Sequence, residues 1–96
     1  MPRREEIEGV LREHKPILRK RFKVDKIGLF GSYARGEDTE QSDVDILVDF
    51  SQPVGWEFID LKEYLEEIIG KRVDLATTGA LKRRLKDIIL KEVRYQ

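Results

Sequence analysis

Two aspartates lie two positions apart in an apolar segment, a pattern that could bind a metal ion. Asp43 and Asp45 belong to the stretch SDVDILVDF, where apolar and polar residues alternate strictly. In a strand this alternation places both carboxylates on one face, where they repel each other. A divalent cation reverses that balance, and Mg²⁺ is commonly held by one or two carboxylates together with phosphates. The pair therefore predicts a magnesium site, with ordinary exposed acids at a strand end as the alternative.

A Gly-Ser pair precedes the aspartates and could bind phosphate. Gly31 and Ser32 follow the apolar segment 24–30 and begin the stretch GSYARG. Backbone N–H groups at a strand-to-helix turn attract anions, and a glycine lets a phosphate approach the backbone without a Cβ in the way. The alternative is a tight turn in which the Ser32 hydroxyl caps a short helix. The residues by themselves leave both interpretations open.

Two further side chains could join this chemistry. Asp74 is expected on the non-core face of a third strand, where it could supply another metal-binding oxygen or act as a base. Arg35 follows the Gly-Ser pair by one helical turn. It could contact a phosphate or pair with a nearby acid such as Glu37, and pairing is the favoured interpretation. The neighbouring Tyr33 could lie near a nucleotide base or pack in a partly exposed position.

The elements that must position these residues are predicted from hydrophobic periodicity. Strands are expected at residues 24–30, 44–50 and 72–76. Helices are expected at residues 4–22, with a kink or a new helix start at Pro16, and at residues 56–69 and 80–93. This order predicts an α/β (α+β) fold with a small mixed sheet of three strands or slightly more, and helices packed mainly on one face.

The last predicted helix carries both an apolar stripe and a basic start. The stripe, which is expected to be buried, consists of Leu81, Leu85, Ile88, Ile89 and Val93. The basic residues are Lys82, Arg83, Arg84 and Lys86. Cations at the start of a helix are unfavourable for its dipole, so they indicate a phosphate or an acidic partner, with a solvated face as the alternative.

Length, composition and charge narrow the class of protein. A chain of 96 residues with 40% apolar residues is expected to form a single domain, residues 1–96. No apolar run suggests a signal peptide or a membrane span, and there is no cysteine, so we expect a cytoplasmic protein without membrane contact. Residues 25–70 carry twelve acidic and three basic side chains between two basic ends, and the net charge is zero. This balance argues against direct binding of nucleic acid.

Together these motifs resemble a known family. An apolar strand, Gly31-Ser32, ten residues, Asp43-x-Asp45 in a second strand and Asp74 in a third are similar to the nucleotidyltransferase superfamily that includes DNA polymerase beta. Within that superfamily, GSYARG and SDVDILVDF resemble the minimal nucleotidyltransferases. In prokaryotes those proteins typically act as antitoxins of HEPN-domain toxins. The resemblance covers nearly the whole chain and implies a polymerase beta-type fold.

The resemblance also implies roles for the residues. Gly31 and Ser32 would bind the triphosphate, with Arg35 at a phosphate, and the three catalytic, metal-binding carboxylates would be Asp43, Asp45 and Asp74. The implied reaction is Mg²⁺-dependent transfer of AMP from ATP, using one or two ions, to a hydroxyl of a partner HEPN ribonuclease, with tyrosine as the expected acceptor. The alternatives are a non-catalytic antitoxin that neutralises its partner by binding, and a small-molecule nucleotidyltransferase. Both homo- and hetero-oligomers are compatible with the sequence.

Overall fold

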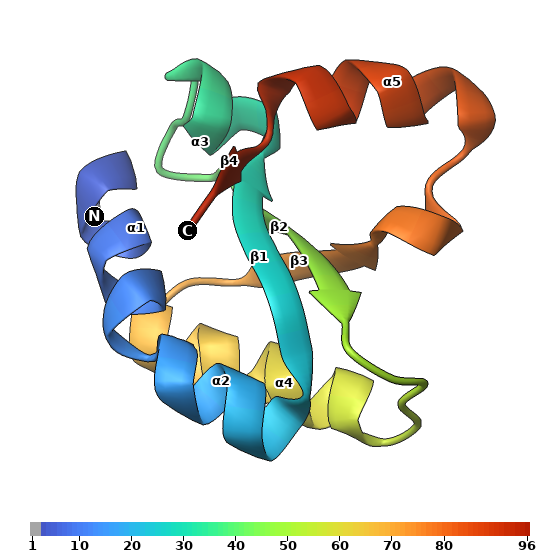
Figure 1. Ribbon diagram of the computed structural model, residues 1–96. Coiled ribbons are helices and arrows are strands. Elements are labelled where there is room, and N and C mark those ends of the chain that lie inside the picture. Colours follow the sequence, from blue (N-terminus) through green and yellow to red (C-terminus); the bar gives the residue numbers. More distant parts are fainter. Residues whose placement is uncertain (1–2) are drawn as a thin grey trace.

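The computed structural model describes residues 3–96, which form a four-stranded sheet with helices (Figure 1). Its strands are β1 (Val24–Phe30), β2 (Val44–Phe50), β3 (Val73–Thr77) and β4 (Arg94–Tyr95). Its α-helices are α1 (Arg4–Glu13), α2 (Lys15–Phe22), α3 (Gly31–Arg35), α4 (Glu57–Ile69) and α5 (Arg83–Glu92), and a 3₁₀ turn, η1, covers Thr78–Ala80. The predicted α/β class and mixed sheet are confirmed, and β4 is the strand that the sequence did not predict.

The sheet order is β3-β2-β1-β4. β1 is antiparallel to β2 and to β4, whereas β2 and β3 run parallel. In the parallel pair, Asp45 lies opposite Asp74, and in the antiparallel pair, Phe30 lies opposite Asp45. The register therefore places the end of β1, where the Gly-Ser pair begins, next to two of the predicted carboxylates.

One face of the sheet carries the main core. Alternating strand residues pack there against α1, α2 and α4, in a cluster that includes Ile27, Leu29, Val44, Ile46, Val48, Leu61 and Leu65. Tyr33, on α3, is also fully buried in this cluster, and Lys71 Nζ donates a hydrogen bond of 3.0 Å to its hydroxyl. The expectation of a partly exposed Tyr33 is therefore wrong, because the ring fills the core at the end of the sheet.

The break between the first two helices is confirmed. Pro16 lies in the first turn of α2, where its missing N–H costs no hydrogen bond. His14 links the two helices, and its Nδ1 lies 2.9 Å from the carbonyl oxygen of Val10. Its capping position agrees with a structural role rather than a catalytic one.

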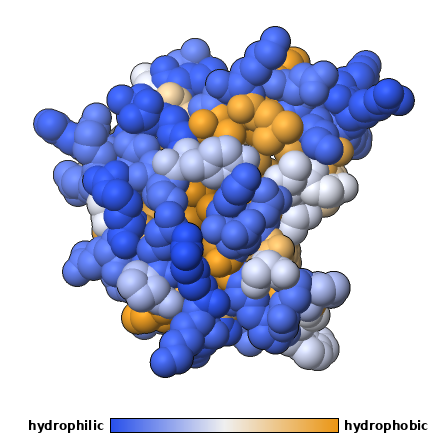
Figure 2. Space-filling view, in the orientation of Figure 1, coloured by the Kyte–Doolittle hydropathy of each residue, from blue (hydrophilic) through white to orange (hydrophobic). Residues whose placement is uncertain are grey.

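The expectation that α5 buries an apolar stripe is wrong. No residue within Arg83–Glu92 is buried, and Leu85 and Ile88 are 50% and 59% exposed. Leu81, Ile89 and Val93 are only half-buried. In Figure 1, α5 extends away from the three core helices, and Figure 2 shows hydrophobic side chains reaching the surface in this part of the molecule. Amphipathic periodicity predicted the helix correctly, but the helix packs on α3 through its C-terminal end instead of joining the main core.

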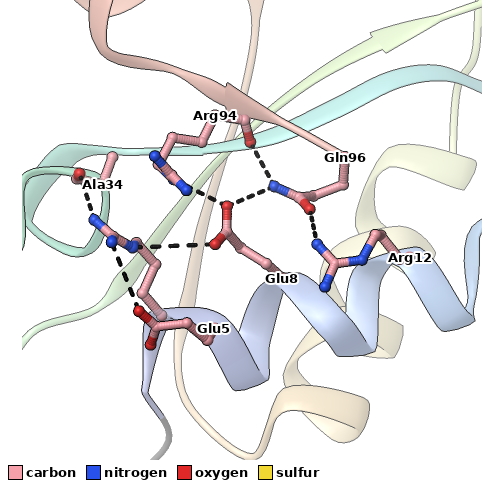
Figure 3. Close-up of polar contacts among 7 residues, drawn as sticks. Glu5, Glu8, Arg12, Ala34, Arg94 and Gln96 are labelled. Atoms are coloured by element: carbon pink, nitrogen blue, oxygen red, sulfur yellow. Dashed lines mark hydrogen bonds and ion pairs between the residues drawn. The ribbon is translucent and has the colours of Figure 1, made fainter.

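The C-terminal strand is held against β1 and α1. A Cβ on Gly28 of β1 would lie 2.9 Å from Val93 Cγ2 and 2.8 Å from the carbonyl oxygen of Arg94, so the C-terminal segment approaches the sheet closely at this glycine. The same C-terminal segment is also bonded to α1. Arg94 Nε and Gln96 Nε2 donate hydrogen bonds of 3.0 and 2.6 Å to Glu8 Oε2 (Figure 3). Glu8 is 5% exposed, so its carboxylate is largely shielded from water, whereas the Arg94 side chain is 47% exposed.

None of the helices in residues 3–96 has the length and the apolar composition that a membrane span requires.

Candidate active site

The structure brings the three predicted carboxylates to one region of the sheet. Asp45 and Asp74 are opposite each other on β2 and β3, and Asp43 immediately precedes β2. Val44, Ile46 and Val48 of the same strand point into the main core, so the carboxylates lie on the other face. Asp43 and Asp74 are exposed, whereas Asp45 is half-buried. The two exposed carboxylates are therefore open to an incoming molecule.

Gly31 lies directly against the central carboxylate. Its φ of 70° is in the left-handed region that glycine favours, and a Cβ at this position would overlap Asp45 Oδ2. The requirement for glycine here thus has two independent causes, the backbone conformation and the close approach of Asp45. The backbone N–H that follows β1 is consequently placed next to the carboxylate cluster.

The predicted anion site contains an anion supplied by the protein itself. Gly31 N donates a hydrogen bond of 2.6 Å to Glu92 Oε2, at the end of α5. Arg35 Nη1 lies 3.1 and 3.3 Å from the two Glu92 carboxylate oxygens, and Arg35 Nε lies 3.0 Å from Glu37 Oε2. Hydrogen bonds with Glu37 and then Glu92 raise the pKa of Arg35 above its ordinary value. The predicted pairing of Arg35 with an acid is confirmed.

Sequence reasoning missed Glu92. The contact spans 61 residues of chain between Gly31 and Glu92, and it depends on the pairing of β4 with β1. No local pattern around position 92 distinguishes this carboxylate from the other charged residues of the last helix. Recognition of Arg94–Tyr95 as an edge strand next to β1 would have placed Glu92 near Gly31.

The alternative in which the Ser32 hydroxyl caps the short helix is wrong. The helix α3 begins at Gly31, so Ser32 is already inside it and makes no side-chain capping hydrogen bond. The carbonyl oxygen of Ser32 instead accepts a 2.8 Å hydrogen bond from the N–H of Glu37, which closes the turn after the helix. The half-buried Ser32 hydroxyl is thus not committed to capping.

Burial and like charges perturb the central carboxyl. Burial, followed by the charges of Asp74 and Asp43, raises the pKa of Asp45 to about 6 from its ordinary value of 3.8. Among residues 3–96, no three His, Cys, Asp or Glu side chains form a group that could hold a metal ion as they stand. The donor set nevertheless fits a hard divalent cation, since three carboxylates lie in one region and their repulsion is what such an ion relieves. Coordination of one ion by all three carboxylates would therefore require a rearrangement of these side chains.

A shallow cavity lies beside the exposed carboxylates. Its volume is about 270 Å³, and Asp43, Asp74, Lys62 and Arg72 are among its lining residues. Glu66, also in the lining, accepts a 3.0 Å hydrogen bond from the backbone N–H of Val73 and so fixes the start of β3. The carboxylates are therefore flanked by cationic groups in two places. Lys62 and Arg72 lie in the cavity, and Arg35 lies near Gly31.

Stability should depend on pH through Asp45. Because the folded-state pKa lies above the ordinary value, the protonated carboxyl favours folding below about pH 3.8, and this contribution is lost as the pH rises through about 6. One pKa unit corresponds to about 1.4 kcal/mol, and solvent screening of a half-buried group reduces the total. We expect Asp45→Asn to be more stable than the wild type by about 1–2 kcal/mol at pH 8 and by much less at pH 4.

Urea unfolding in the presence of a chelator, from pH 4 to pH 8, measures this difference. Asp49→Asn is the matched control, because Asp49 lies on the same face of β2 but opposite Lys26 rather than Asp74. An Asp45→Asn difference that stays constant across the pH range would contradict the prediction.

Comparisons with known proteins agree with this arrangement. Residues 11–96 match a family model described as the nucleotidyltransferase domain. A relative from Thermococcus cleftensis, named protein adenylyltransferase MntA, is 54% identical over 92 residues, which cover 95% of this chain and 93% of the relative.

Solved structures show the same fold. One, described provisionally as a minimal nucleotidyltransferase, has a TM-score of 0.75 at 35% identity and covers 95% of this chain and 89% of its own. Another, a toxin-antitoxin crystal structure with AMP-PNP, has a TM-score of 0.68 at 25% identity and covers 96% of this chain and 70% of its own.

The fold, the carboxylates beside Gly31 and these matches define a nucleotidyltransferase, and the chain belongs to the nucleotidyltransferase domain family. More narrowly, it belongs with the minimal nucleotidyltransferases, as the resemblance of GSYARG and SDVDILVDF implied. The expected enzyme class is thereby confirmed. The roles of the individual site residues stay predictions.

Proposed function

We propose that this protein transfers AMP from ATP to a tyrosine hydroxyl of a partner HEPN-type toxin, in a Mg²⁺-dependent reaction that silences the toxin. One observation carries the proposal. The backbone N–H of Gly31, which binds an anion in this structure, lies directly beside the carboxylate of Asp45. The relative that is 54% identical is named a protein adenylyltransferase, and a toxin-antitoxin structure with AMP-PNP shares the fold.

The chain's own residues suit this reaction. Gly31 N–H and Arg35 would bind the phosphates through charge-assisted hydrogen bonds, with Ser32 next to them. Asp43, Asp45 and Asp74 would hold Mg²⁺, which when bound neutralises phosphate charge and lowers the pKa of a coordinated hydroxyl. No covalent bond to the protein is needed, so positioning and electrostatics would supply most of the rate.

The proton and the leaving group are accounted for. The acceptor oxygen attacks the α-phosphorus, the bond from that phosphorus to the bridging oxygen of the β-phosphate breaks, and pyrophosphate leaves. The exposed carboxylate of Asp74 would take the hydroxyl proton, because it lies beside Asp45 and at the edge of the cavity. Lys62 and Arg72 would then face the acceptor side of the reaction.

Intact-mass spectrometry tests the proposal directly. The protein is incubated with Mg²⁺, ATP and a co-expressed HEPN-type partner, and the mass of the partner is followed with time. We expect a gain of AMP units that disappears with Asp43→Ala and persists with Asp49→Asn. Peptide mapping of the product then identifies the modified side chain, and modification of a residue other than tyrosine would correct the acceptor.

A second function, neutralisation of a partner by binding alone, is favoured by one observation. Leu85 and Ile88 of α5 and the 80% exposed Trp56 are large apolar side chains that residues 3–96 leave open to solvent. A tight complex with no mass gain on the partner, under any nucleotide, would support this second function and contradict the transfer reaction.

A further inference from the structure

The carboxylate of Glu92 stands where the proposed function needs a phosphate. It accepts the Gly31 N–H over 2.6 Å and lies 3.1 Å from Arg35 Nη1, and these are the two donors expected to hold the triphosphate. Its side chain is only 18% exposed, whereas that of Arg35 is 46% exposed. The Glu92 carboxylate is therefore largely shielded, whereas the Arg35 side of this charge-assisted pair is open to solvent.

Tertiary structure fixes Glu92 at this point. The next residue, Val93, packs against Gly28, and Arg94 pairs with Leu29 in the sheet. Beyond it, Arg94 and Gln96 are hydrogen-bonded to the buried Glu8 of α1 (Figure 3). The backbone at position 92 consequently has little freedom, and the carboxylate can leave the anion site chiefly by rotation of its own side chain.

A carboxylate and a phosphate cannot both accept the single Gly31 N–H. The Gly31 amide has one hydrogen, and its short bond to Glu92 Oε2 uses it fully. A triphosphate placed at Gly31 would also bring several negative charges next to that of Glu92, in a place partly shielded from water. Nucleotide binding therefore requires the side chain of Glu92 to withdraw, at the cost of its bonds to Gly31 and Arg35.

We infer that Glu92 sets the affinity for the nucleoside triphosphate by competing with its phosphates for Gly31 and Arg35. This inference rests on the proposed function. After the Glu92 side chain withdraws, its negative charge still repels the bound triphosphate. Removal of its charge should therefore strengthen nucleotide binding. Loss of one charge-assisted competitor of this kind corresponds to about a tenfold change in affinity.

Calorimetric titration of the full chain with AMP-PNP and Mg²⁺, without an acceptor, tests the inference. We expect Glu92→Gln to bind AMP-PNP about tenfold more tightly than the wild type. Asp87→Asn is the matched control, because it removes one negative charge from an exposed position on the same helix and should leave the affinity unchanged. Equal affinity of wild type and Glu92→Gln, or weaker binding by the variant, would overturn the inference and leave Glu92 a structural partner of Arg35.

A measurement on the unaltered protein guards against misfolding of the variant. In NMR spectra of the ¹³C,¹⁵N-labelled protein, AMP-PNP should shift the Gly31 amide resonance, and the Glu92 side-chain carboxyl carbon should shift with it at the same ligand concentrations. A Glu92 carboxyl signal that does not respond at saturation contradicts the competition.

These outcomes separate the inference from the proposed function. If the wild type modifies its partner but Glu92→Gln binds no more tightly, only the competition is wrong. If neither protein binds AMP-PNP, the assignment of Gly31 and Arg35 to a triphosphate fails, and the competition fails with it.

Discussion

Asp45→Asn is expected to lower the rate of AMP transfer by at least about 10²–10³-fold, the range found when a single group that stabilises transition-state charge is removed. Asn has nearly the same shape as Asp, so the packing beside Gly31 and the pairing of β2 with β3 should persist. What is lost is the central negative charge of the carboxylate cluster, opposite Asp74 and adjacent in the strand to the segment that carries Asp43. The rate is measured as the time course of mass gain on the partner.

Two controls make this result specific. Asp49→Asn removes the same charge from the same strand but away from Asp74, and it should transfer AMP at the wild-type rate. The unfolding free energy of Asp45→Asn should exceed that of the wild type at pH 8, because repulsion within the cluster is relieved. Transfer near the wild-type rate by a folded Asp45→Asn protein would remove Asp45 from the proposed site.

The carboxylates could be placed from the sequence because strand alternation is a strong local rule. Val44, Ile46 and Val48 fill the core, so Asp45 must lie on the other face, and its position opposite Asp74 follows once β2 and β3 pair in parallel. The strands 24–30 and 44–50 were predicted with their observed bounds for the same reason. Local hydrophobic patterning was thus sufficient to predict the fold class and the carboxylate part of the candidate site.

The other half depends on contacts between distant parts of the chain. Glu92 reaches Gly31 only because β4 pairs with β1, and a strand of two residues leaves no periodic signal. The apolar stripe around Leu85 predicted a helix, but periodicity shows only that one face is apolar, not which surface covers it. The left-handed conformation of Gly31 likewise could not be distinguished from an ordinary turn until Asp45 was seen beside it.

Gly31→Ala is expected to impair both stability and nucleotide binding. The left-handed φ of 70° costs a non-glycine residue about 1–2 kcal/mol, and the new Cβ would in addition overlap Asp45 Oδ2. Relief of that overlap must move the Asp45 side chain or the Gly31 backbone, and either shift separates the anion-binding N–H from the carboxylates. We expect AMP-PNP affinity to fall at least about tenfold, as for the loss of one hydrogen bond to a charged group, and the unfolding free energy to fall by more than the conformational cost.

Gly36→Ala separates the two causes of the stability loss, which are the left-handed backbone conformation and the overlap with Asp45. Gly36 has a nearly identical φ of 73°, but within residues 3–96 a Cβ there would have no atom within 4 Å apart from its chain neighbours, so its variant has the conformational cost without the overlap. Urea unfolding should show a larger loss for Gly31→Ala, and calorimetric titration should show weaker AMP-PNP binding only for Gly31→Ala. In an Asp45→Ala background the carboxylate is gone, although the Cβ of residue 45 stays 3.1 Å from the new methyl group. The stability loss from Gly31→Ala should then shrink toward that of Gly36→Ala, whereas an undiminished loss would show that Asp45 is not the group that requires glycine at position 31.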